Sequence, residues 1–224
     1  MKTFNHVAGL PELTQLETDE STGQRFYIAP TGDRLPSVTT VLGHFKKKSL
    51  QAWRQRVGEE EANKISTRAS MRGTKFHNMM EKYLNNDKTL FEDVMPDMRM
   101  SFYDMEILLD NIDNIYYIES PLWSTTLGLA GRTDVIAEYN GVLSIIDFKT
   151  SLRLKREADI KNYFQQAAAY ALMYEERVGT PIDQIVVLIS VDGEPPQSFV
   201  KNKNDYVDEL KNLIRLYKEE TYVS

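Results

Sequence analysis

The spacing of apolar residues changes near residue 110, which divides the chain into a helical first half and a second half richer in strands. Between residues 49 and 83 the apolar positions have a helical period, and Gly58 and Gly73 are the positions at which this helix is expected to break. Pro96 opens another helix, whose apolar positions are Met98, Phe102, Met105, Leu108 and Leu109.

Shorter elements precede these helices. The first twenty residues have no strong period and predict an irregular arm. A turn at residues 30–33 joins two short strands, one at residues 25–28 and one at Leu35. Ser37 is then placed to cap a short helix that Gly43 would end.

Strands dominate after residue 110. They are predicted at residues 114–123, in a hairpin at 131–149, at 184–190, and as an edge strand through Phe199. A helix at residues 159–178 lies between the hairpin and the next strand, and an amphipathic helix closes the chain. This order predicts a single α/β domain, in which residues 1–110 form a mostly helical part and residues 111–224 form the core that contains the sheet.

The hairpin can be placed in register because Asn140-Gly141 is the preferred two-residue loop of a tight turn. With this loop, Tyr139 faces Val142, and each residue farther along one arm faces its counterpart on the other arm. The register can therefore be counted outward to the open end of the hairpin.

Counting outward places Asp134 directly opposite Asp147, and Lys149 opposite Arg132 on the same face. Like charges directly across a sheet repel each other, so a positive group is expected between the two carboxylates. The simplest such group is a divalent cation with Lys149 beside it. The alternative is a surface hairpin whose carboxylates pair with Arg132 and Lys149.

Composition restricts the chemistry further. The 224 residues suffice for one large domain, and the absence of cysteine excludes disulfides, cysteine-bound zinc and thiolate-bound iron–sulfur clusters. A metal would then be held by carboxylates, imidazoles or backbone carbonyls, a donor set that favours hard cations. There is no apolar run of bilayer length and no secretory signal, so we expect a cytoplasmic protein without a membrane partner.

The net charge of −6 argues against a protein that coats nucleic acid by bulk electrostatics. Cations are nevertheless concentrated locally, from Lys46 to Lys75 and again from Arg153 to Lys161. These two segments could line a channel for nucleic acid, or they could be solvated helix faces.

Four motifs occur in an order that resembles the PD-(D/E)xK nuclease superfamily. They are Gly73-Thr74-Lys75-Phe76-His77, Gly131-Arg132-Thr133-Asp134, Asp147-Phe148-Lys149 and Gln166-Ala167-Ala168-Ala169-Tyr170. Each motif alone is weak, whereas the ordered set is specific. More narrowly, the set resembles the RecB-like exonuclease branch, where a sequence such as Gly131–Asp134 stands in place of the nominal Pro-Asp. The stretch Pro36-Ser37-Val38-Thr39-Thr40-Val41-Leu42 is similar to mitochondrial genome maintenance exonucleases and related phage exonucleases.

This resemblance implies a central mixed β-sheet flanked by helices and a metal-dependent active site. Asp134, Asp147 and Lys149 would be the catalytic residues. The ligands of Mg²⁺, which Mn²⁺ could replace, would be His77, Asp134, Asp147, Glu119 and Phe148, the last through its backbone. From the residues alone, His77 could also be a packing residue, Glu119 an exposed strand end, and Lys149 a plain ion-pair partner of Asp147.

Eight further residues are candidates for contacts with the substrate: Gln166, Tyr170, Ser37, Thr39, Arg72, Arg132, Thr150 and Ser151. Gln166 and Tyr170 share one helix face, where an amide can bind a phosphate and a ring can stack on a base. The hydroxyl groups can donate to a phosphate, and the two arginines are the cations nearest the proposed centre. The alternatives are a core position for Tyr170 and an ordinary helix cap for Ser37.

Together these observations predict a Mg²⁺-dependent deoxyribonuclease, and the resemblance makes it an exonuclease. Its substrate would be single-stranded DNA or DNA ends in replication, recombination or repair, where it could meet other proteins of those processes. The alternatives are an endonuclease of the same fold and a module that binds DNA ends without cleaving them. A metal-binding enzyme on another α/β scaffold is disfavoured by the Gln166 and Tyr170 pair.

Overall fold

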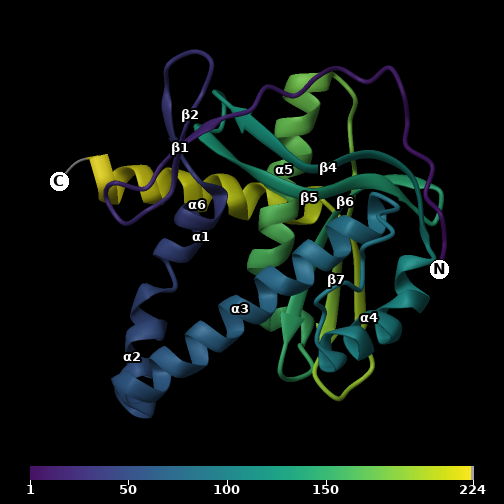
Figure 1. The fold of residues 1–224 in the computed structure, drawn as a ribbon. Helices are drawn as coiled ribbons and strands as arrows, with labels where there is room; N and C mark the ends of the chain where they lie inside the picture. Colours follow the sequence, from purple (N-terminus) through teal and green to yellow (C-terminus); the bar gives the residue numbers. More distant parts are fainter. Residues whose placement is uncertain (223–224) are drawn as a thin grey trace.

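A five-stranded mixed sheet forms the centre of the protein in the computed structural model, which describes residues 1–222 (Figure 1). Its strands, in spatial and chain order, are β4 (Ile112–Ser124), β5 (Leu129–Tyr139), β6 (Val142–Ser151), β7 (Gln184–Val191) and β8 (Gln197–Asn202). All neighbours are antiparallel except β6 and β7. A parallel pair needs a long crossover, which helix α5 (Lys161–Val178) supplies. The mixed sheet expected from the sequence is confirmed.

Helices cover both faces of this sheet. Helices α1 (Val38–His44), α5 and α6 (Asn204–Tyr222) pack on one face, and α3 (Glu59–Leu84) and α4 (Pro96–Leu109) pack on the other (Figure 1). Side chains alternate between these two cores along each strand, because successive residues of a strand point to opposite faces. None of the helices within residues 1–222 is both long enough and apolar enough to cross a bilayer.

Helix α2 (Lys47–Val57) and the first half of α3 extend away from the sheet (Figure 1). No residue of α2 is buried. The expected break at Gly58 is confirmed, since its φ of 93° ends α2 in a conformation that suits glycine. The expected break at Gly73 is wrong, because α3 continues through it.

The N-terminal segment is more ordered than the sequence predicts. Residues Glu17–Asp19 form β1, which pairs with β2 (Phe26–Ile28), and β2 pairs with β3 (Arg34–Pro36). The predicted hairpin around residues 30–33 is therefore confirmed with a third strand added. Ahead of α5, Glu157–Asp159 form a short 3-10 turn, so that helix begins at Lys161 rather than at residue 159.

The tight turn at Asn140-Gly141 is confirmed, with φ values of 52° and 76°. The predicted register holds from Tyr139 and Val142 as far as the pair Val135 and Ile146, where the ladder between β5 and β6 ends.

Beyond that pair the two strands separate. The outer part of β5 pairs with β4, where Arg132 faces Pro121, and the outer part of β6 pairs with β7, where Lys149 faces Ile189. The prediction that Lys149 lies opposite Arg132 is therefore wrong. Asp134 and Asp147 are likewise not paired across the sheet. Each strand end is held by its outer neighbour, which leaves a gap in the sheet at Asp134.

Candidate metal centre and active site

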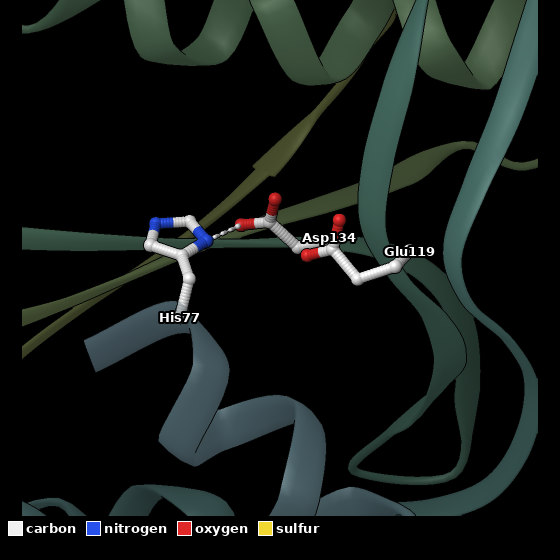
Figure 2. Close-up of side chains that lie close together, drawn as sticks. All are labelled: His77, Glu119 and Asp134. Carbon is white, nitrogen blue, oxygen red and sulfur yellow. Dashed lines mark ion pairs between the residues drawn. The ribbon is translucent and has the colours of Figure 1, made fainter. Parts of the chain in front are cut away.

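Three side chains from different elements meet at the gap between β5 and β6. Figure 2 shows His77 of α3, Glu119 of β4 and Asp134 of β5 directed toward one another, and one potential ligand atom from each lies within 4.8 Å of the others. Nδ1 of His77 is 3.4 Å from Oδ2 of Asp134 (Figure 2). The structure thus brings together three of the residues that the sequence proposes as metal ligands.

The pairing of β4 with β5 brings Glu119 to Asp134. The flanking residues Ile118 and Ser120 pair with Val135 and Thr133, so Glu119 lies beside Asp134 in the sheet. Its φ of 46° is a left-handed conformation in the middle of a strand. Such a backbone costs a non-glycine residue about 1–3 kcal/mol and is found preferentially at functional sites.

The two carboxylates of this cluster have opposite pKa shifts. Burial, followed by the negative charge of Asp134, raises the pKa of Glu119 to about 7. Burial also acts to raise the pKa of Asp134, but contacts with His77 and the positive charge of Lys149 outweigh it and the pKa is lowered. Burial acts to lower the pKa of His77, but the interaction with Asp134 is stronger, so the pKa is raised.

This donor set fits a hard divalent cation. Two carboxylates and one imidazole supply the oxygen and nitrogen atoms that Mg²⁺ and Mn²⁺ accept. Ionising Glu119 beside Asp134 is unfavourable in the protein alone, and a cation held between them would remove that repulsion.

Asp147 belongs to a second group on the same gap. Nζ of Lys149 lies 2.5 Å from its Oδ2, and Nε2 of Gln166 donates to its Oδ1 over 3.2 Å. Asp147 therefore faces Lys149 and Gln166 rather than joining the cluster of His77, Glu119 and Asp134.

Lys149 is held in its charged form by these carboxylates. Burial acts to lower its pKa, but Asp147 and Asp134 raise it further than burial lowers it. The pKa of Asp147 is raised to about 6, mainly by burial and against the attraction of Lys149. An ammonium group of this kind is suited to stabilising negative charge rather than to accepting a proton.

Tyr163 is a residue of this group that the sequence reasoning missed. Nζ of Lys149 lies 5.3 Å from the centroid of its ring, in the range of a cation–π contact. Tyr163 lies three residues before Gln166 on α5, so the helical spacing was the available signal.

Tyr170 lies in the core and does not present its ring to solvent. It is 3% exposed and packs against Gly131, where an added Cβ would be 2.7 Å from Cε1 of the ring. The core alternative for this residue is therefore the one that the structure supports. The close contact also explains why a glycine precedes Asp134 by three residues: it allows α5 to approach β5.

Phe148 contributes its backbone to the gap. Its N–H donates to Oδ2 of Asp134 over 2.8 Å, and its buried side chain meets Phe76 edge-on at 6.5 Å. Phe148 thus fixes the orientation of Asp134, and a metal contact through its carbonyl stays a prediction.

The four candidate hydroxyl groups differ in their surroundings. Ser37 is buried and is the N-cap of α1, where its hydroxyl accepts a hydrogen bond from the N–H of Thr40 over 2.9 Å. Thr39 is exposed in the first turn of this helix. Ser151 is buried and donates to the carbonyl of Arg153 over 2.6 Å. Thr150, the residue after Lys149, lines a groove together with residues of α3.

The two candidate arginines lie on opposite sides of the gap. Arg72 forms an ion pair with Asp192 at 2.9 Å across the end of β7. Arg132 donates to the carbonyl of Glu119 over 2.5 Å and to Gln15 over 3.2 Å. Each arginine is thus partly engaged, Arg72 by a carboxylate and Arg132 by neutral oxygens.

A comparison of the sequence with protein families points to the same residues as the geometry of the gap. Residues 46–221 match the model of the PD-(D/E)XK nuclease superfamily, a range that includes His77, Glu119, Asp134, Asp147 and Lys149. The chain belongs to this superfamily.

Curated relatives of this PD-(D/E)XK protein include Mitochondrial genome maintenance exonuclease 1 of Homo sapiens, with 30% identity over 130 residues. The Mus musculus protein of the same name is 26% identical over 129 residues. Each alignment covers 54% of this chain and 38% of the relative, so the match spans well under half of the relatives' length. Among solved structures, SSO0001 matches with a TM-score of 0.44 and 13% identity, over 80% of this chain and 75% of that one.

Proposed function

We propose that this PD-(D/E)XK protein is a divalent-metal-dependent deoxyribonuclease that shortens DNA from its ends in replication, recombination or repair. The observation that carries the proposal is the meeting of two groups at one gap in the sheet. An acidic cluster with an imidazole lies on one side, and a buried carboxylate paired with a lysine lies on the other. The relatives named exonucleases support removal from ends over internal cleavage.

His77, Glu119 and Asp134 would hold the cation, and Asp147 and the backbone of Phe148, whose N–H donates to Asp134, border the same gap. We propose Mg²⁺, with Mn²⁺ also accepted because imidazole is a good ligand for it. When bound, a divalent cation supplies Lewis-acid stabilisation of the attacking water and of the charge on the phosphodiester.

The reaction adds water across a phosphodiester: a P–O bond forms to the water oxygen, and the P–O bond to one sugar breaks. The phosphate stays with one product, and the departing sugar oxygen ends as a hydroxyl. The Lys149 ammonium would stabilise the negative charge that builds on the phosphate. Asp147, aligned by Gln166, would orient the attacking water by accepting its hydrogen bond.

The test is digestion of end-labelled linear DNA, single-stranded and duplex, and of circular DNA, in Mg²⁺, in Mn²⁺ and in EDTA. We expect metal-dependent loss of linear substrate, no cleavage of circles, and no activity in EDTA. Lys149→Ala should be inactive, whereas Lys88→Ala, which removes an exposed lysine without an ion pair in the described chain, should behave as wild type.

The other outcomes separate the alternatives. Cleavage of circles would make the protein an endonuclease. Retention of linear DNA in a binding assay, without cleavage in either metal, would leave a module that binds DNA ends and would overturn the catalytic proposal.

A further inference from the structure

A groove of about 400 Å³ lies near the active site, between α3, the start of α4 and the ends of β6 and β7. Two elements of the site contribute to its lining: β6 through Thr150, the residue after Lys149, and α3 through Arg68, Met71 and Lys75, the last of which precedes His77 by two residues. Met95, just before α4, and Leu152, just after β6, complete its apolar part.

The charges in this groove suit an anionic ligand. Arg68 and Lys75 are exposed, and neither forms an ion pair with any residue in the described part of the chain. This differs from the adjoining part of α2 and α3, where Lys64 pairs with Glu60 and Arg54 with Glu59. The carboxylates in the groove are Asp97 and Asp192, and the second is neutralised by Arg72 at 2.9 Å.

The same groove exposes large apolar side chains. Met71, Met95 and Leu152 are 56%, 58% and 62% exposed. A ligand that offered only phosphate groups would have no apolar surface to pack against these side chains. An unpaired strand offers both phosphates and the flat faces of its bases, whereas a duplex keeps those faces stacked inside. Methionine is suited to such contacts because its side chain is flexible and polarizable.

We propose that this groove holds the unpaired nucleotides next to the bond that is cleaved, with their bases on Met71, Met95 and Leu152 and their phosphates on Arg68 and Lys75. The inference rests on the proposed nuclease function and adds the residues that select a single strand. A duplex end would have to separate before its strand could occupy the groove.

The apolar contacts are tested by binding of a fluorescent oligothymidine, and of a blunt duplex of equal length, followed by anisotropy in EDTA so that no cleavage occurs. The double variant Met71→Ser with Leu152→Ser should bind the single strand about tenfold more weakly and the duplex unchanged. Met100→Ser with Ile107→Ser on α4 is the matched control, since these side chains are 61% and 71% exposed outside the groove.

The cationic contacts are tested by salt dependence. Arg68→Gln and Lys75→Gln should each lower the slope of log affinity against log salt by about one, whereas Lys88→Gln should leave it unchanged. In cleavage assays the groove variants should raise KM and leave kcat at saturating DNA as in wild type. All of these side chains are exposed, so the melting temperature should not move.

The results separate this inference from the proposed function. Three outcomes would overturn the proposed role of the groove, even if the protein cleaves DNA. The groove variants could bind the single strand with wild-type affinity, the Met100 and Ile107 control could lose as much affinity, or the groove variants could lose as much affinity for the duplex. Failure of the wild type to cleave any DNA in either metal would overturn the proposed function instead.

Discussion

Gly131 and Tyr170 lie in separate sequence motifs and form one contact in the structure. Their closeness sets the distance between α5 and β5, and with it the position of Gln166, one turn before Tyr170, beside Asp147. The glycine is required for space rather than for an unusual backbone, since its φ lies outside the positive range.

Gly131→Ala should therefore destabilise the protein by about 1–3 kcal/mol, because the new Cβ would be 2.7 Å from Cε1 of Tyr170. For a chain of this size the melting temperature should fall by roughly 2–4 °C per kcal/mol. Gly73→Ala is the matched control, because nothing but Oγ1 of Thr150, at 4.0 Å, lies near that position in α3. It should be neutral or stabilising. Equal melting temperatures for both variants would contradict this role of Gly131.

The ring of Tyr163 contacts the ammonium group of Lys149, so the ring should matter more than the hydroxyl. Tyr163→Phe should cleave DNA at the wild-type rate, whereas Tyr163→Leu should lower kcat by about tenfold with little change in KM, since a desolvated cation–π contact contributes about 1–2 kcal/mol. Steady-state kinetics on a linear substrate measures both. If Tyr163→Phe lowered kcat as much as Tyr163→Leu, the hydroxyl rather than the ring would be the group that matters.

The charges at the gap predict that the metal-free protein loses stability as pH rises from acidic to neutral. Glu119 and Asp147 have raised pKa values, of about 7 and about 6, so the unfolded chain ionises first and stability falls between the unfolded and folded values. His77, whose pKa is also raised, stabilises the fold when protonated and loses that contribution as pH rises through its folded value. These three groups act in the same direction. The lowered pKa of Asp134 acts in the opposite direction, but only below the ordinary pKa of an aspartate.

Melting curves in EDTA across this pH range measure the effect. Glu119→Gln should flatten the dependence, and Glu61→Gln, an exposed residue of α3, should leave it as in wild type. Adding Mg²⁺ at the upper end of the range should restore the lost stability in wild type. A pH dependence unchanged by Glu119→Gln would contradict the assigned repulsion.

At the scale of elements, the site is created where β5 and β6 part. The turn at Asn140-Gly141 is local chemistry, so the sequence predicted the register as far as Val135 and Ile146. The point of separation depends on β4 and β7, which are distant in sequence and compete for the strand ends, and the hairpin alone could not reveal it. The burial of Tyr170 likewise depends on how α5 docks.

Helix α1 gives a test at this scale, because Ser37 caps it. Ser37→Ala should cost about 1 kcal/mol of stability and leave KM for DNA unchanged, since the hydroxyl accepts from the N–H of Thr40. Thr39→Ala, two residues on and exposed, is the comparison. A raised KM with unchanged stability in Ser37→Ala would instead favour the phosphate contact that the sequence suggested.

At the scale of the whole molecule, we propose that the sheet supplies the chemistry and that α3 supplies the approach for the substrate. Residues from α3, β4, β5, β6 and α5 converge on one gap, and the groove is lined by other residues of α3 and β6. The ordered motifs allowed the sequence to indicate most of the converging residues. The groove could not be foreseen, since it depends on the packing of α3 against the ends of α4, β6 and β7.

The central claim is that the cluster at the gap is a metal-dependent hydrolytic site. Its most direct test is the single-turnover rate of cleavage of an end-labelled single strand in saturating Mg²⁺, compared between wild type, Asp134→Asn and Glu61→Gln. We expect Asp134→Asn to lose about 10²–10³-fold in rate, Glu61→Gln to match wild type, and EDTA to stop cleavage. Cleavage by Asp134→Asn at the wild-type rate, or cleavage that persists in EDTA, would contradict the account.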